Sequence, residues 1–204
     1  GKTTILKIIS GLASPTAGDF TLFGKTGKNV SPYMSRIGTL IEAPGVYPNM
    51  SARENLKLKC LAMGVRKKGC IDDLLRIVGL ENTGRKKIRN FSLGMKQRLG
   101  IALALVGDPD IVILDEPING LDPMGIREMR DFFIALVKEQ NMTLLISSHI
   151  LTEIEHIADT IGIIKDGTIV REVSMAKLKS ESPSGLEDYF MDIMTGRKEN
   201  ENTI

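Results

Sequence analysis

Cysteine is nearly absent from this chain of 204 residues, and so are long apolar runs. The two cysteines, Cys60 and Cys70, exclude a disulfide framework and are interpreted as free thiols in a reducing compartment. A membrane-spanning helix needs about 18 consecutive apolar residues, and no window of the sequence approaches that length. We therefore expect a globular chain, and any membrane-spanning segment that it works with belongs to another chain.

An excess of charge of one sign is also lacking, since 27 basic residues face 25 acidic ones for a formal charge of +2. This balance excludes a polybasic nucleic-acid surface over the whole chain and an acidic disordered tail over much of it. Two basic clusters, Arg66-Lys67-Lys68 and Arg85-Lys86-Lys87, are interpreted as solvated faces, with contact to anionic lipid as the alternative.

After residue 110, short β-branched runs alternate with helical patterns. This alternation predicts an α/β fold with a parallel sheet. Asp166-Gly167 predicts a hairpin. Strands are expected over 111–114, 142–147, 161–164 and 168–171, and helices over 123–138, 150–158, 174–179 and 185–194.

The first half of the chain is mostly helical between residues 50 and 106, which we interpret as an inserted helical subdomain. Ser51 and Glu54 form a capping box that begins one of its helices. Residues 1–196 are predicted to form a single domain, and 197–204 a frayed tail. The other expected elements are a helix from Ile5 to a cap at Gly11, strands over 19–23 and 36–41, and helices over 51–63, 71–78 and 94–106.

Gly1-Lys2-Thr3-Thr4 matches the second half of the phosphate-loop pattern G-x-x-x-x-G-K-[ST] and runs directly into a helix. In such a loop the lysine reaches the β- and γ-phosphates and the threonine hydroxyl binds Mg²⁺, so all four residues are candidates for nucleotide binding, Thr3 also for metal. A tag scar or a chance match is the alternative. The chain begins at Gly1, so we expect the first loop glycine and the preceding strand to be missing and ATP binding to be weak.

Asp115-Glu116-Pro117 follows the buried run 111–114, and His149 follows the run 142–147. An Asp at a strand end can hold Mg²⁺, and a neighbouring Glu can polarise a water that attacks the γ-phosphate. Because ligands of open α/β sheets bind at the carboxyl ends of strands, we expect Asp115, Glu116 and His149 to face the phosphate loop. An acidic cap and a structural histidine are the alternatives. Ser92, at the start of the helix 94–106, either binds an anion or is a plain N-cap.

The order of these elements resembles the nucleotide-binding domain of ABC transporters, a RecA-like P-loop NTPase, over nearly the whole chain. Gly1–Thr4 is similar to the end of Walker A, Phe91–Met95 to the signature Leu-Ser-Gly-Gly-Gln, and Ile111–Glu116 to Walker B. Asn119–Asp122 is similar to the D-loop, and His149 to the switch histidine.

The resemblance implies an ATPase that uses ATP and Mg²⁺ and works as a head-to-tail dimer with two ATP molecules at the interface. Ser92 and Gly94 then complete the nucleotide site of the partner subunit, and Asp122 belongs to the same site. His149 holds the γ-phosphate, and Glu116 acts on the attacking water.

Three positions depart from the family pattern. Leu93 and Met95 replace a Gly and the Gln of the signature, and Glu42 stands where the Q-loop glutamine is expected. Glu42 can still bind Mg²⁺ through oxygen, but it adds a negative charge beside the triphosphate. With its flanking residues it resembles the subgroup of ATPases that export lantibiotics or bacitracin for self-protection.

The leading hypothesis is therefore an ATPase subunit that drives export of a lantibiotic, a bacitracin-like peptide or a drug. It is expected on the cytoplasmic face of the cell membrane, bound to a separate permease whose coupling helix enters a groove lined by residues 42–50 and the following helix. A related ATPase acting on ribosomes or DNA is the alternative, although one domain, a charge of +2 and the lack of heptads speak against it, and no nucleic acid is expected. A regulatory module with degraded catalysis is the third possibility, and the intact Asp115, Glu116 and His149 argue against that.

Overall fold

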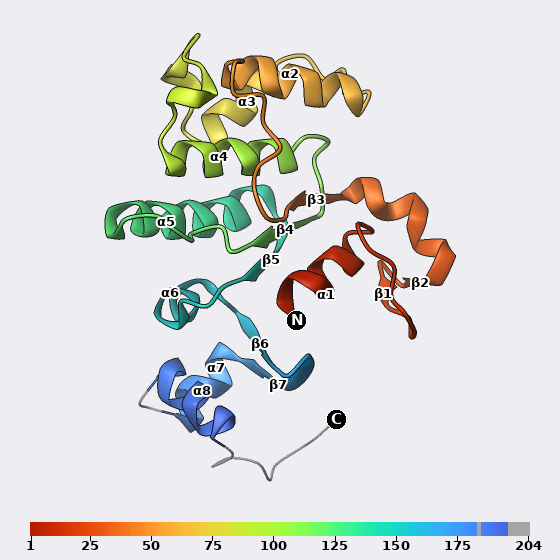
Figure 1. Ribbon diagram of the computed structural model, residues 1–204, viewed down its shortest axis with the longest axis vertical. Coiled ribbons are helices and arrows are strands. Elements are labelled where there is room, and N and C mark those ends of the chain that lie inside the picture. Colours follow the sequence, from red (N-terminus) through yellow and green to blue (C-terminus); the bar gives the residue numbers. More distant parts are fainter. Residues whose placement is uncertain (183–184, 196–204) are drawn as a thin grey trace. The chain divides into compact units, whose positions relative to one another are not determined.

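The computed structural model describes residues 1–182 and 185–195 of the chain (Figure 1). The chain divides into two compact units: one holds Thr3–Ser147, and the other joins Gly1–Lys2 to the residues from Ser148 onward. The frayed tail predicted over 197–204 lies outside the described residues, and the single domain over 1–196 stays a prediction.

A parallel sheet forms the centre of the unit Thr3–Ser147. Its strands β3 (Ile37–Leu40), β4 (Ile111–Asp115) and β5 (Thr143–Ser147) lie in the order β3-β4-β5. The side chains of Val112, Ile113 and Leu114 in β4 are fully buried, as expected for a central parallel strand covered on both faces. The register pairs Asp115 with Ser147, so the last residues of β4 and β5 lie side by side.

Helices surround this sheet, and one of them approaches it closely because of two glycines. A Cβ on Gly38 of β3 would lie 2.0 Å from the carbonyl oxygen of Ala104, and one on Gly100 would lie 3.0 Å from Leu40. The helix α4 therefore packs directly on β3, and in Figure 1 it lies between β3 and the pair α2 and α3. The helices of this unit are α1 (Lys2–Ile9, whose first residue belongs to the other unit), α2 (Ala52–Ala62), α3 (Cys70–Ile77), α4 (Leu93–Ala104) and α5 (Pro123–Gln140).

Side-chain caps fix where these helices begin. The hydroxyl of Ser51 caps α2 by accepting from the N–H of Glu54, and the N–H of Ser51 donates to the carboxylate of Glu54. The predicted capping box is therefore confirmed. Hydrogen bonds from the backbone N–H and the hydroxyl of Ser51 lower the pKa of Glu54 from 4.5 to about 2. Ser92 caps α4 by accepting from the N–H of Met95, and Asp122 caps α5 ahead of Pro123.

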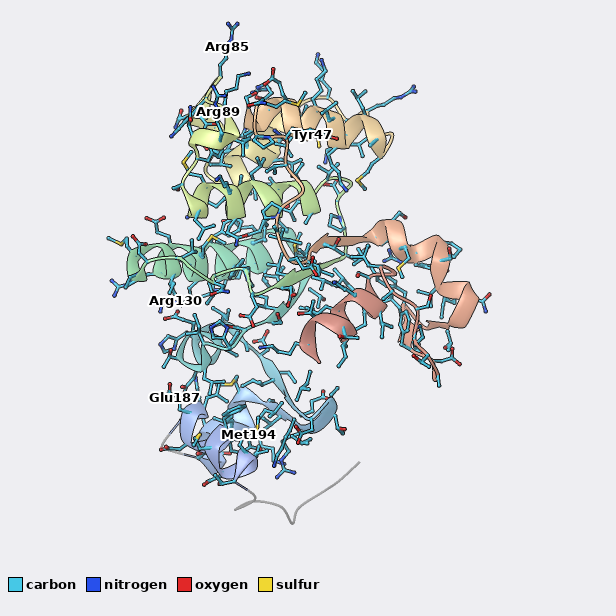
Figure 2. The ribbon with its side chains drawn as sticks, in the orientation of Figure 1. Tyr47, Arg85, Arg89, Arg130, Glu187 and Met194 are labelled. Carbon is cyan, nitrogen blue, oxygen red and sulfur yellow. The ribbon has the colours of Figure 1, made fainter. Side chains whose placement is uncertain are left out.

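The helical region between β3 and β4 is closed at its base. Ser51 and Lys87 form an antiparallel bridge, and the N–H of Ile88 donates to the carbonyl of Met50 at 2.9 Å. The basic side chain of Arg85 is exposed and extends away from this region (Figure 2). The remaining elements of the unit are the hairpin β1 (Thr21–Leu22) and β2 (Lys25–Thr26) and the 3₁₀ helices η1 (Gly27–Arg36), η2 (Glu81–Thr83) and η3 (Ile88–Asn90).

The second unit contains the hairpin that Asp166-Gly167 predicts, formed by β6 (Thr160–Lys165) and β7 (Thr168–Ser174). The parallel sheet extends differently from the prediction. Its third strand is β3, whereas β6 pairs in an antiparallel sheet with β7 among the residues described, because the two-residue turn brings β7 directly back along β6. The unit also holds α6 (Leu151–Ile157), α7 (Met175–Glu181) and α8 (Leu186–Met194), which pack through Leu178, Leu186 and Tyr189.

Over the ranges 1–182 and 185–195, the structure contains no helix that is both long enough and apolar enough to pass through a bilayer.

Candidate functional site

The site is centred on the carboxylate of Asp115, at the end of β4. The hydroxyl of Thr3 donates to its Oδ2 at 2.8 Å, and the hydroxyl of Ser147 donates to its Oδ1 at 2.5 Å. Asp115 is 8% exposed, and both donors are uncharged. A buried carboxylate that is hydrogen-bonded to neutral hydroxyls offers oxygen atoms of the kind that bind a divalent cation.

Glu116 turns the chain sharply away from the sheet. Its φ of 49° lies in the left-handed region, which is uncommon for Glu. Its N–H donates both to the carbonyl oxygen and to the hydroxyl of Ser147, at 3.1 and 3.0 Å. Ser147 therefore contacts both Asp115 and Glu116. These hydrogen bonds fix the direction in which the chain leaves β4 at the half-buried Glu116.

The phosphate-loop residues are distributed over both units. In the unit Thr3–Ser147, Thr3 contacts Asp115 as expected, whereas Thr4 is exposed. In the other unit, the ammonium of Lys2 donates to the carbonyl of Ser148 at 3.0 Å, and Gly1 is exposed. His149 also belongs to that unit and is exposed in the turn between β5 and α6.

Glu42 does not join Thr3 and Asp115. Its carboxylate is paired instead with the ammonium of Lys7 on α1, with Nζ and Oε1 2.5 Å apart. The prediction of Thr3, Glu42 and Asp115 as joint metal ligands therefore stays a prediction. Three or more His, Cys, Asp and Glu residues do not gather in any one place in the part of the chain that the structure describes.

The signature residues meet the D-loop residues at the start of α4. A Cβ on Gly94 would lie 3.6 Å from Leu121, and one on Gly120 would lie 3.1 Å from Leu93. Ser92 and Asp122 both act as N-caps, the latter by accepting from the N–H of Gly125 at 2.8 Å. Capping thus accounts for their positions, and their roles toward a nucleotide stay predictions.

A groove of about 550 Å³ lies between the loop after β3, α2 and the later part of α4, and residues on both sides of Glu42 line it. Tyr47 lies against α2 (Figure 2), where its N–H donates to Asn55 at 2.8 Å. The side chain of Tyr47 is 59% exposed and that of Leu58 37%. The apolar lining includes Leu12, Ile41, Ala43, Pro44, Leu58 and Leu103.

Sequence reasoning missed two residues of this site, Ser147 and Lys7. Ser147 was recognisable as the final residue of its strand, because in-register parallel strands place their ends side by side. Lys7 follows Thr3 by four positions, so both lie on one face of α1. That periodicity was the available signal for Lys7.

Comparisons with known proteins agree on one family. The ABC transporter model matches residues 1–119. The bacitracin transport ATP-binding protein BcrA of Bacillus licheniformis is 48% identical over 193 residues, which cover 94% of this chain and 63% of that protein. The lantibiotic transport ATP-binding protein SrtF of Streptococcus pyogenes is 47% identical, covering 84% of this chain and 73% of that protein. The chain thus spans less than two thirds of the length of the first of these relatives.

Two solved structures share the fold. An ATP-binding subunit of an ABC transporter has a TM-score of 0.77 at 26% identity, covering 95% of this chain and 83% of that one. An ATP-binding cassette in a dimeric post-hydrolysis state with ADP and Pi has a TM-score of 0.73 at 25% identity, covering 86% and 81%. These likenesses confirm the predicted α/β fold of P-loop NTPases.

Proposed function

This chain belongs to the ABC transporter family, and we propose that it is the subunit that binds and hydrolyses ATP to drive export of an antimicrobial peptide. The observation that carries the proposal is the contact between Thr3 and Asp115, at 2.8 Å. It joins the end of the phosphate-loop motif to the end of the Walker B strand, as nucleotide chemistry requires.

Thr3 and Asp115 supply the hydroxyl and carboxylate oxygens that Mg²⁺ prefers, so the residues present fit this ion. Glu42 is the third proposed ligand. When bound, Mg²⁺ neutralises charge on the phosphates. Lys2 reaches the β- and γ-phosphates, and the backbone N–H groups of Gly1, Thr3 and Thr4 at the start of α1 donate to them.

Hydrolysis is assigned to Glu116 and His149. The carboxylate of Glu116 orients the attacking water and accepts its proton as the bond from the water oxygen to the γ-phosphorus forms and the bond to the β,γ-bridging oxygen breaks, so that ADP and phosphate leave. The imidazole of His149 donates to a γ-phosphate oxygen and stabilises the negative charge there. Ser147 supports the arrangement, because its two contacts to the N–H of Glu116 orient that residue.

The working unit is a head-to-tail dimer with a second ATP-binding subunit. Ser92, Gly94 and Asp122 complete the nucleotide site of the partner, as the start of α4 presents N–H groups to its phosphates. Leu93 and Met95 in place of the usual signature residues leave Ser92 and Gly94 available for this contact.

The apolar groove receives the coupling helix of a separate transmembrane permease. In this proposal the subunit works at the inner face of the cell membrane. The relatives named for bacitracin and lantibiotic transport support a peptide antibiotic as the exported molecule. Glu42 supports the same subgroup, since it replaces the usual glutamine.

The decisive experiment is Glu116→Gln in the intact protein purified with its permease. We expect Mg²⁺-dependent ATP hydrolysis to fall by about 10²–10⁴-fold while ATP binding persists, because the proton acceptor is lost and the shape is kept. Glu139→Gln, an exposed position on α5, is the matched control. Undiminished turnover in Glu116→Gln overturns the role of Glu116, and recovery of the wild-type protein with ribosomes and without a membrane protein overturns the transport role.

A further inference from the structure

The ion pair between Lys7 and Glu42 joins α1 to the loop that follows β3. Lys7 Nζ lies 2.5 Å from Glu42 Oε1, and Glu42 adopts a left-handed φ of 66°. The two side chains are 37% and 65% exposed. The pair thus involves a residue with an uncommon backbone conformation and lies at the surface, where water and ions reach it.

Lys7 lies close to the residues proposed to bind metal. Thr3 and Lys7 are four positions apart, so they lie on one face of α1, about 6 Å or slightly more than one turn from each other along its axis. On that face Thr3 contacts Asp115 and Lys7 contacts Glu42. The two carboxylates are thus aligned along α1, one facing a hydroxyl and the other facing a cation.

We propose that Lys7 is a positioning residue that holds the Glu42 carboxylate away from the metal site until Mg²⁺ and nucleotide arrive. This inference rests on the proposed function. Glu42 then breaks its ion pair with Lys7, and its carboxylate binds Mg²⁺ beside Thr3 and Asp115. Glu42 adds a negative charge to the nucleotide site. Before Mg²⁺ binds, Lys7 neutralises that charge.

The exposure of the pair suits such an exchange. Exposed ion pairs contribute little to stability, so a divalent cation with nucleotide phosphates is able to displace Lys7. The loop that carries Glu42 runs from β3 up to α2 (Figure 1), and its residues Ile41, Ala43 and Pro44 line the groove. When Glu42 is released from Lys7, the loop that forms one wall of the groove therefore loses its ion pair with α1.

The test measures metal binding without turnover. Mn²⁺, a paramagnetic substitute for Mg²⁺, is titrated into the intact protein with a non-hydrolysable ATP analogue, and free Mn²⁺ is followed by electron paramagnetic resonance. We expect Lys7→Met to lower the Mn²⁺ concentration for half-saturation by about 1.5- to 5-fold, the range expected for an exposed ion pair. Lys7→Arg restores the wild-type value, and Lys57→Met, at an exposed lysine of α2, leaves it unchanged.

The same substitutions in an E42Q protein separate a specific pair from a general loss of positive charge. There we expect Lys7→Met to behave like Lys57→Met, because no carboxylate remains to be released. An equal decrease with and without E42Q overturns the inference, as does an unchanged or raised Mn²⁺ requirement in Lys7→Met.

Hydrogen exchange provides a second readout. In the nucleotide-free protein, Lys7→Met is expected to speed amide exchange in peptides covering residues 41–47, and Mn²⁺ with the analogue is expected to remove the difference. Identical exchange in the nucleotide-free proteins overturns the inference and leaves the proposed function standing. Failure of the wild-type protein to bind Mn²⁺ with the analogue overturns both.

Discussion

The hydroxyl of Thr3 donates to the carboxylate of Asp115 at 2.8 Å, although 112 positions separate the two residues. The contact requires both that α1 begins beside the sheet and that β4 ends there. Ser147 holds the other oxygen of Asp115, so three chain segments meet at one buried carboxylate.

Ser147→Ala is expected to lower the free energy of unfolding by about 1.5–3 kcal/mol, because a buried carboxylate loses a hydrogen-bond donor. Urea unfolding measures the change. Ser35→Ala, at an exposed position, is the control and is expected to cost less than about 0.5 kcal/mol. Equal effects at the two positions contradict the role of Ser147.

Gly38→Ala is expected to destabilise the protein by about 2–3 kcal/mol, since the new Cβ meets the carbonyl oxygen of Ala104 at 2.0 Å and α4 must shift. Gly162→Ala is the control, because a Cβ there has no neighbour within 4 Å. Thermal unfolding compares them. A Gly38→Ala protein with the same unfolding temperature as the wild type shows that α4 moves away from β3 without a loss of stability.

The capping box predicts a pH dependence of stability. Glu54 has a pKa of about 2 in the folded chain against an ordinary 4.5, so its contribution is complete above about pH 4.5 and is lost as the pH falls toward 2. The gap between the urea midpoints of wild type and Glu54→Gln is therefore expected to be constant near neutral pH and to shrink below about pH 4.5. A gap that is the same at about pH 3 and pH 6 is the contrary result.

If the groove receives a permease, as we propose, Leu58→Asp is expected to weaken that association at least about tenfold, because a charge enters the apolar groove, while nucleotide binding is unchanged. Leu61→Asp makes the same change on the same helix at a position that is 67% exposed and outside the groove lining. Co-purification from detergent measures both. Equal losses in the two variants show that association is sensitive to any negative charge added to α2 and that the groove is not the docking site.

Asp122 separates capping from nucleotide chemistry. Asp122→Ala is expected to cost about 1 kcal/mol of stability, because the N–H of Gly125 loses its acceptor, whereas Asp122→Asn keeps a cap. If Asp122 belongs to the nucleotide site, as we propose, Asp122→Asn lowers ATPase activity at unchanged stability. Full ATPase activity in Asp122→Asn shows that Asp122 acts only as the N-cap of α5.

Much of the fold follows from local patterns. The capping box at Ser51, the buried strand that ends at Asp115 and the hairpin at Asp166-Gly167 were all predicted, because each depends on a few neighbouring residues. Sheet membership was harder. The alternation of strands and helices over 110–165 predicted a parallel sheet but does not say how far it extends, and among the described residues β6 pairs only with β7, in the predicted hairpin.

The site was predicted in part. Motif spacing brought Thr3 and Asp115 together correctly, whereas it assigned Glu42 to the metal without regard to Lys7. A competing ion pair depends on the position of a flexible side chain, which a motif does not encode. Ser147 escaped notice because its role arises from register between two strands.

The bridge between Ser51 and Lys87 has a consequence for which changes the helical region tolerates. The helical excursion leaves and returns to the same point, so α2 and α3 form a cassette with adjoining ends. Changes within α2 and α3 therefore leave the β3–β4 scaffold and its buried carboxylate in place, provided that the altered helices still fit the surface of α4.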